Sequence, residues 1–154
     1  MRRWRDDSLR CFAHPEQVYC IASSPFDDDL VATGGGDDRV RMFSLSSGKM
    51  LHELPPFEDS VIGVAFSHDG TYLAGASMDG TAKVWLAHSG VEALTLEGPT
   101  EGIMWLEWHP RGHVLLAGTE DGFIFMWQIH RETTLGHPDV FLAQCLHVLS
   151  GHSG

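Results

Sequence analysis

The stretch LAGASMDGTAKVW, at residues 73–85, decides the fold, because its pattern occurs twice more in the chain. One copy is VATGGGDDRVRMF at 31–43, and the other is LLAGTEDGFIFMW at 115–127. Each copy has an acidic turn at its centre and ends on an aromatic residue, and the copies follow one another at intervals of 42 residues. A fixed period of this length is typical of repeat architectures, so the sequence predicts three copies of one structural unit.

The register of the repeat identifies residues that we expect to hold equivalent structural positions. An aspartate lies six residues before the final aromatic residue in every copy, and the pairs are Asp37 and Phe43, Asp79 and Trp85, and Asp121 and Trp127. Upstream of the copies, VYCIASSP, VIGVAFSH and IMWLEWHP align with one another at 18–25, 61–68 and 103–110. The similarity therefore covers nearly the whole unit.

Within a unit, the pattern of apolar residues is that of β-strands. In the second unit, turns at 68–70, 78–80 and 89–90 separate four short runs of apolar residues. Asp-Gly suits the tight turn between the second and third strands, and the aromatic residue that ends the third strand fills the gap between neighbouring sheets. Four antiparallel strands in roughly 40 to 45 residues make one blade of a β-propeller. The predicted fold class is therefore all-β.

The three units resemble WD repeats, a family whose members fold as β-propellers. The resemblance implies a structural network of His, Ser or Thr, Asp and Trp side chains. Its counterparts here are His14, Asp37 and Phe43 in the first unit, Ser77, Asp79 and Trp85 in the second, and Thr119, Asp121 and Trp127 in the third. This chain departs from the family pattern because the Asp after the final Trp is missing every time, and because the second and third units lack the His.

Two stretches are similar to a narrower group of WD-repeat proteins. They are SVIGVAFSHDGTYLAGASMDGTAKVW at 60–85 and LEWHPRGHVLLAGTEDGFIFMW at 106–127, and they resemble the angio-associated migratory cell protein family. Members of that family are associated with cell migration and, in fungi, with chaperoning a newly made ribosomal protein of the large subunit. The resemblance implies one of these settings, ribosome assembly or cell migration, for this chain.

The length predicts an incomplete propeller, because closed propellers have about four to eight blades and 154 residues hold fewer than four units of 42. We expect about three blades: the first at 14–55, the second at 56–97, and the inner three strands of a third at 98–130. An open set of blades exposes flat apolar faces, which favours self-association. The chain is therefore expected to be either a truncated propeller without autonomous activity or one that needs a second chain to close its ring.

The two ends of the chain and one internal segment fall outside these three blades. The leading segment, 1–13, is expected to contain the outer strand of a preceding blade at 8–12. Residues 145–154 are expected to form an outer strand and the start of a further, truncated repeat. Between them, 131–144 contains Gly136 and Pro138 and shows no strand pattern. We expect an irregular insertion there, either a surface loop or the trace of a blade lost through a splicing or gene-model error.

Charge and composition exclude several classes of function. The chain has 21 acidic and 10 basic residues, for a net charge of −11, which repels nucleic acid and attracts basic partners. Its three cysteines have no Cys-x-x-Cys spacing, and no apolar stretch approaches the length of a membrane span. We therefore expect neither a nucleic-acid nor a membrane partner, and a cytoplasmic location, with a nuclear one as the alternative.

No group of residues in the sequence points to catalysis or to a cofactor. His109 and His113 are four residues apart, but they share a turn with Pro110 and Gly112, and no third metal ligand is in register. The serines lack the sequence context of an activated nucleophile. The sequence therefore predicts a protein that is not an enzyme and has no metal or other cofactor.

The resemblance also implies where a partner would bind. WD propellers bind through the loops that lead into the first strand of each blade and the loops between the second and third strands, here 14–17, 57–60, 99–102, 36–39, 78–80 and 120–122. These loops contain nine acidic residues and one basic residue, Arg39. We expect a protein-interaction scaffold that binds a basic segment, steered by Glu16, Glu58, Asp59, Glu101 and Glu120.

Trp105 is a second candidate, because it replaces Gly63 and Cys20 of the other units. Such a large side chain on the first strand either fills space at a blade junction or anchors a bound partner. The scaffold hypothesis assigns Trp105 the second role, as the anchor of the basic segment.

Overall fold

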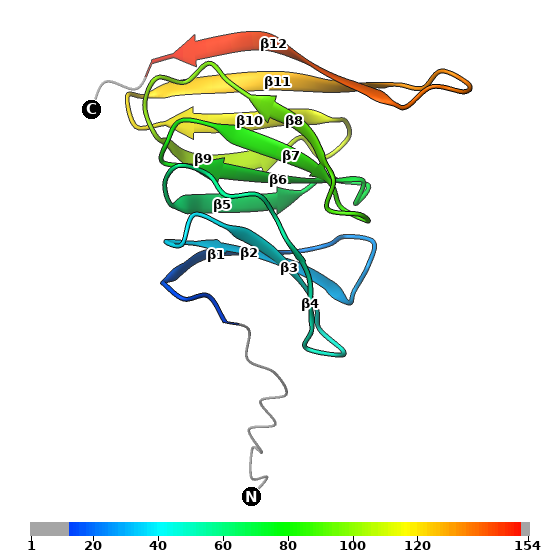
Figure 1. Ribbon diagram of the computed structural model, residues 1–154. Coiled ribbons are helices and arrows are strands. Elements are labelled where there is room, and N and C mark those ends of the chain that lie inside the picture. Colours follow the sequence, from blue (N-terminus) through cyan, green and yellow to red (C-terminus); the bar gives the residue numbers. More distant parts are fainter. Residues whose placement is uncertain (1–12, 152–154) are drawn as a thin grey trace, which may run out of the picture.

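The computed structural model describes residues 13–151, and within that range the chain forms three four-stranded antiparallel sheets (Figure 1). Blade 1 contains β1 (Val18–Ser23), β2 (Leu30–Gly35), β3 (Val40–Ser44) and β4 (Met50–Glu53). Blade 2 contains β5 (Val61–Phe66), β6 (Tyr72–Ser77), β7 (Ala82–Leu86) and β8 (Glu92–Leu96). Blade 3 contains β9 (Ile103–Trp108), β10 (Val114–Thr119), β11 (Phe123–Glu132) and β12 (Val140–Ser150). No helix in the described residues is long and apolar enough to span a membrane.

The architecture confirms the all-β prediction and the open propeller of about three blades. Every sheet keeps its strands in chain order, and the sheets stack from blade 1 through blade 2 to blade 3 without closing a ring. The outer strand expected at 8–12 and the repeat start expected at 152–154 lie outside the described residues.

The turns between the second and third strands show why glycine or aspartate follows the repeated aspartate. Gly80 and Gly122 adopt positive φ angles of 87° and 86°, which glycine reaches without strain. Blade 1 has Asp38 at this position, with a φ of 63°, and aspartate tolerates the left-handed region better than most residues. The same tight turn therefore forms in all three blades.

The core lies between the sheets. One buried cluster joins blades 1 and 2 and includes Met42, Val61 and Trp85, and a second joins blades 2 and 3 and includes Tyr72 and Trp127. Each sheet is thus held mainly by its neighbour, as expected for blades that cannot bury both faces alone. Trp85 lies in the first cluster and Trp127 in the second, so both rings fill space between neighbouring sheets.

The segment 131–144 differs from the irregular insertion expected there, because half of it is regular. Strand β11 continues to Glu132 and β12 starts at Val140, and the two pair along their whole length. Only 133–139 forms a connecting loop, and Arg131 donates to Asp139 across its base at 2.9 Å. The additional residues lengthen both strands of a hairpin, which extends beyond the other hairpins at the right of Figure 1.

Candidate protein-interaction rim

The loops expected to bind a partner form one edge of the three blades. Within each blade, the loop leading into the first strand is hydrogen-bonded to the turn between the second and third strands. The backbone bonds are Gly36 N to Gln17 O at 2.8 Å, Met78 N to Ser60 O at 3.0 Å, and Glu120 N to Gly102 O at 2.9 Å. These turns lie together at the left of Figure 1.

The loops also join one blade to the next. Phe57 N, at the start of blade 2, donates to Asp38 O of blade 1 at 2.9 Å. A Cβ placed on Gly80 of blade 2 would lie 3.1 Å from Glu101 O of blade 3, so the two backbones touch there. The loops therefore form one continuous surface, which we call the acidic rim: residues 14–17, 36–39, 57–60, 78–80, 99–102 and 120–122.

The charges of the acidic rim are of two kinds. The five carboxylates expected to steer a partner are exposed: Glu16, Glu58, Asp59, Glu101 and Glu120. Asp37 and Asp79 are partly buried and are engaged inside their own blades. Asp37 pairs with His14 and Arg41, whereas Asp79 serves its turn, since Asp79 Oδ1 accepts from Thr81 N at 2.7 Å. The single basic residue, Arg39, lies 3.6 Å from Glu53 and is thus partly neutralised.

Blade 1 has a buried polar cluster behind the rim, centred on His14. His14 Nδ1 lies 2.9 Å from Asp37 Oδ1, and His14 Nε2 lies 2.6 Å from Thr33 Oγ1. Arg41 donates to the other oxygen of Asp37 and, through Nε, to Glu53 at 3.0 Å. Burial raises the pKa of Asp37, but the hydrogen bonds and charges of His14 and Arg41 outweigh it and hold that pKa below its ordinary value.

Blade 2 has aromatic packing where blade 1 has this cluster. Phe57 takes the place of His14, and its ring meets Trp85 edge-on with centroids 5.9 Å apart. Trp85 is fully buried, and its Nε1 has no hydrogen-bond partner. Ser77 Oγ donates to Asp59 O at 2.8 Å, and Lys83 lies over the Phe57 ring at 4.9 Å.

Blade 3 keeps only part of the network. Thr119 donates its hydroxyl to Asp121 and accepts from Phe123 N at 3.2 Å. Trp127 is 3% exposed and stacks on Phe125 with centroids 5.6 Å apart. The structural residues expected from the repeat are therefore buried or in turns, but among the described residues only blade 1, through His14 and Asp37, has a complete His–Thr–Asp cluster.

The repeat register misses two members of the cluster, Thr33 and Arg41. Thr33 aligns with Gly75 and Ala117, because Gly35 occupies the position of Ser77 and Thr119. The signal available in the sequence is a charged residue, Arg41, in an apolar strand. Arg41 aligns with Lys83 of blade 2, which lies over the Phe57 ring.

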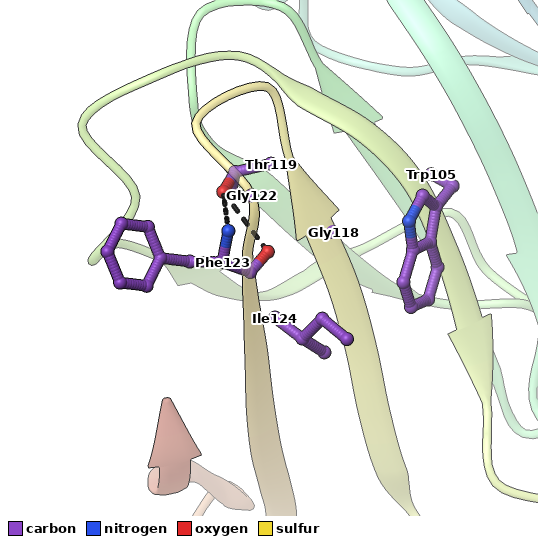
Figure 2. A pocket seen from close by; sticks show the side chains of 6 residues that line it. All are labelled: Trp105, Gly118, Thr119, Gly122, Phe123 and Ile124. Atoms are coloured by element: carbon purple, nitrogen blue, oxygen red, sulfur yellow. Dashed lines mark hydrogen bonds between the residues drawn. The ribbon is translucent and has the colours of Figure 1, made fainter. Parts of the chain in front are cut away.

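Trp105 lies on β9, 43% exposed, and lines a cavity of about 210 Å³ with Thr119, Phe123 and Ile124 (Figure 2). Its indole packs closely over Gly118, where a Cβ would come within 2.0 Å of Nε1. The equivalent Gly63 of blade 2 lies against blade 3, since a Cβ there would meet the Leu106 side chain at 2.3 Å. Trp105 therefore faces outward from the open side of blade 3.

Cys20 holds the same position in blade 1, and its environment argues against a nucleophilic role. Burial raises the pKa of its thiol to about 12. The thiol donates to Gly34 O at 3.6 Å, which also favours the protonated form. A thiol with so high a pKa stays protonated at neutral pH, whereas the thiolate is the reactive form.

Comparison with known proteins places this geometry in context. The chain matches the family model "WD domain, G-beta repeat" over residues 6–44, 48–85 and 90–128. The human angio-associated migratory cell protein is 42% identical over 125 residues, which are 80% of this chain and 28% of the human protein. Periodic tryptophan protein 2 of Arabidopsis thaliana is 32% identical over 129 residues, which are 80% of this chain and 14% of that protein. The similarity expected from 60–85 and 106–127 is thereby confirmed.

Two solved structures share the fold. They are described as "Structure of U3-55K" and "Crystal structure of RRP9 WD40 repeats", and both align with a TM-score of 0.78. Their sequences are 22% and 23% identical to this one, and the alignment covers 92% of this chain and 41% of each solved chain.

Proposed function

The chain belongs to the WD40 repeat family, and on that premise we propose that it is a non-catalytic scaffold that binds a basic segment of another protein through its acidic rim. Proteins of this family generally act as protein-interaction scaffolds. The observation that carries the proposal is the continuity of the rim. Five exposed carboxylates lie on loops that are hydrogen-bonded within blades and touch between them.

The electrostatics favour a Lys- or Arg-rich partner. Exposed charges interact over about 8 Å at physiological ionic strength, so neighbouring rim carboxylates act together on an approaching cation. Such rim charges raise the association rate and make it depend on salt, more than they raise affinity. In blade 2 a cavity of about 300 Å³ opens beside the rim, and Glu58, Asp79 and Lys83 are among the residues that line it.

The remaining part of the proposal concerns what covers the open faces of blades 1 and 3. The chain spans 28% of the length of the human relative and 41% of each solved structure. Tyr19 and Ile21 are 53% and 67% exposed on the open side of blade 1, since they alternate with Cys20 and Ala22, which pack towards blade 2. We propose that further blades or a second chain cover these faces, and that without them the three blades self-associate.

In our proposal Trp105 belongs to the face of blade 3 that a further blade or chain covers. Of the two roles expected for Trp105, filling a blade junction fits best, because the equivalent residue Gly63 lies at the junction of blades 2 and 3. The wider setting follows from the family resemblance alone: ribosomal-protein chaperoning or cell migration, in the cytoplasm or the nucleus. Neither nucleic acid nor membrane is a partner in this proposal, because the rim carries negative charge.

The test is the binding of a fluorescent Lys/Arg-rich peptide to the chain, measured by anisotropy at several salt concentrations. We expect saturable binding that weakens steeply with salt, and at least about a tenfold loss on combining Glu58→Lys, Asp59→Lys and Glu101→Lys. The matched control reverses three exposed charges at the opposite edge, through Asp28→Lys, Glu92→Lys and Glu132→Lys. Both variants change the net charge equally, so equal losses, or no loss in the rim variant, would contradict the proposal.

A further inference from the structure

Two histidines and an aspartate meet at the edge opposite the acidic rim. His68 and Asp69 lie in the turn between β5 and β6, and His113 lies in the turn between β9 and β10. One ligand atom from each of the three residues lies within 4.8 Å of the others. His113 is 45 positions from His68 in the sequence, and the packing of blade 2 against blade 3 brings it to His68 and Asp69.

The carboxylate and one imidazole are held in place before any ligand arrives. Asp69 accepts from Ser67 Oγ at 2.7 Å and from Thr71 Oγ1 at 2.7 Å, on different oxygens. His113 Nε2 lies 2.9 Å from Asp69 Oδ2, and its ring stands edge-on to Tyr72 with centroids 4.9 Å apart. Hydrogen-bonded carboxylates and packed histidines of this kind orient the ligands of metal sites.

The second imidazole is positioned to complete a site. The His68 and His113 rings have centroids 5.3 Å apart and are tilted by 40°. Two imidazoles on one tetrahedral ion, with metal–nitrogen distances of about 2.0–2.1 Å, place their ring centres roughly 5 Å apart. Because His68 is exposed, its side chain is free to adjust to an ion. Imidazole and carboxylate together suit zinc and its neighbours in the first transition series.

We propose that His68, Asp69 and His113 bind a divalent transition-metal ion that fastens blade 2 to blade 3. Three protein ligands leave a fourth position open to water or to a ligand atom from a partner. On binding, the ion replaces the proton that His113 Nε2 shares with Asp69 Oδ2, and that proton is released to the solvent.

The joint between blades 1 and 2 lacks this chemistry and serves as an internal comparison. Backbone bonds from Ser24 N to Leu30 O and from Ser67 N to Tyr72 O place the two first turns in register. Pro25 and Phe26 then take the places of His68 and Asp69, and neither is a metal ligand. The candidate site is therefore specific to one joint and is no general feature of the repeat.

The experiment titrates the metal-free chain with Zn²⁺ by calorimetry and repeats the titration with Co²⁺, whose absorption reports coordination by nitrogen and oxygen. We expect one saturable site, a higher melting temperature with Zn²⁺, and at least about a tenfold weaker affinity for both His68→Ala and His113→Gln. His88→Ala is the matched control, because His88 is exposed at the turn between β7 and β8 and lies outside the cluster. We expect it to bind like the unmodified chain.

His68→Ala carries the decision, because an exposed side chain is removed and the fold is left intact. The proposal is overturned if His68→Ala binds Zn²⁺ as tightly as the unmodified chain, if His88→Ala loses affinity equally, or if no saturable binding is seen.

Discussion

Blades 1 and 2 fill the same positions behind the acidic rim with different chemistry. In blade 1, His14, Asp37 and Arg41 form a buried charged cluster, with side chains at most 8% exposed. In blade 2, the Phe57 ring packs against Trp85, and the nearby cation, Lys83, donates to the backbone carbonyl of Pro56, next to the rim. Even so, the first two strands of both blades pair with the same register, including a shift after the first residue of the first strand.

The difference teaches that the backbone of a blade does not depend on its polar network. Both blades share four antiparallel strands and a left-handed residue after the turn aspartate. Both also have a buried aromatic residue near the end of the third strand. Behind them, either charges or rings fill the space. The two kinds of filling should respond differently to substitution and to pH.

The largest effect is expected in blade 2, where Trp85→Ala removes a fully buried ring between two sheets. We expect the free energy of unfolding to fall by about 3–5 kcal/mol, through lost burial and the cavity that remains. Urea denaturation followed by far-UV circular dichroism measures it. Trp105→Ala is the control, since Trp105 is 43% exposed, and a loss as large as that of Trp85→Ala would contradict the assigned core.

The next effect compares the two turn aspartates. Asp37→Ala leaves His14 and Arg41 buried without their shared partner, so we expect a loss of about 2–4 kcal/mol. Asp79→Ala removes the carboxylate that accepts hydrogen bonds from two backbone N–H groups and from the Thr81 hydroxyl near the surface. We expect it to lower the free energy of unfolding by about 1–2 kcal/mol. The same denaturation experiment measures both. Equal losses would show that the cluster in blade 1 adds nothing to the turn.

The pH dependence of blade 1 should be smaller than the effect of deleting the carboxylate. Because the pKa of Asp37 is lower in the folded state than the value of about 3.9 in unfolded chains, the ionised group stabilises the fold above that pH. This contribution is lost as the pH falls through the folded pKa. We therefore expect the stability difference between the unmodified chain and Asp37→Asn to narrow between pH 6 and pH 3, and a constant difference would contradict the pairing.

The smallest effect is expected from Lys83→Met, which removes a partly exposed cation from the Phe57 ring while keeping the apolar stem. We expect a loss of less than about 1 kcal/mol. Arg41→Met at the aligned position of blade 1 should cost more, because it leaves Asp37 buried beside His14 alone. Thermal melting of the two variants side by side makes the comparison, and the reverse order would refute the distinction between the blades.

The sequence was sufficient to predict features that depend on residues close together in the chain. Alternating apolar residues and the Asp-Gly turns at 79–80 and 121–122 determine strands and turns locally, and the buried Trp85 and Trp127 follow from their repeat position. The segment 131–144 was harder, because Gly136 and Pro138 in the turn hide the alternation of the strands on either side.

Features that depend on residues far apart in the chain could not be predicted from the sequence. Thr33 aligns with Gly75 and Ala117 and not with Ser77 and Thr119, and it reaches His14 only because the loop before β1 folds back over β2. His68 and His113 meet across two blades, so neither lies at the spacing of a metal motif. The charge of the rim loops is legible in the sequence, but their hydrogen-bonded continuity depends on how the blades stack.

The matched segments do not coincide with the sheets: the one at 48–85 begins just before β4 of blade 1 and ends in β7 of blade 2. This segment therefore supplies the outer strand of one sheet and the inner three strands of the next. Neighbouring repeats are in this way joined by the hydrogen bonds of a shared sheet as well as by the packing between sheets.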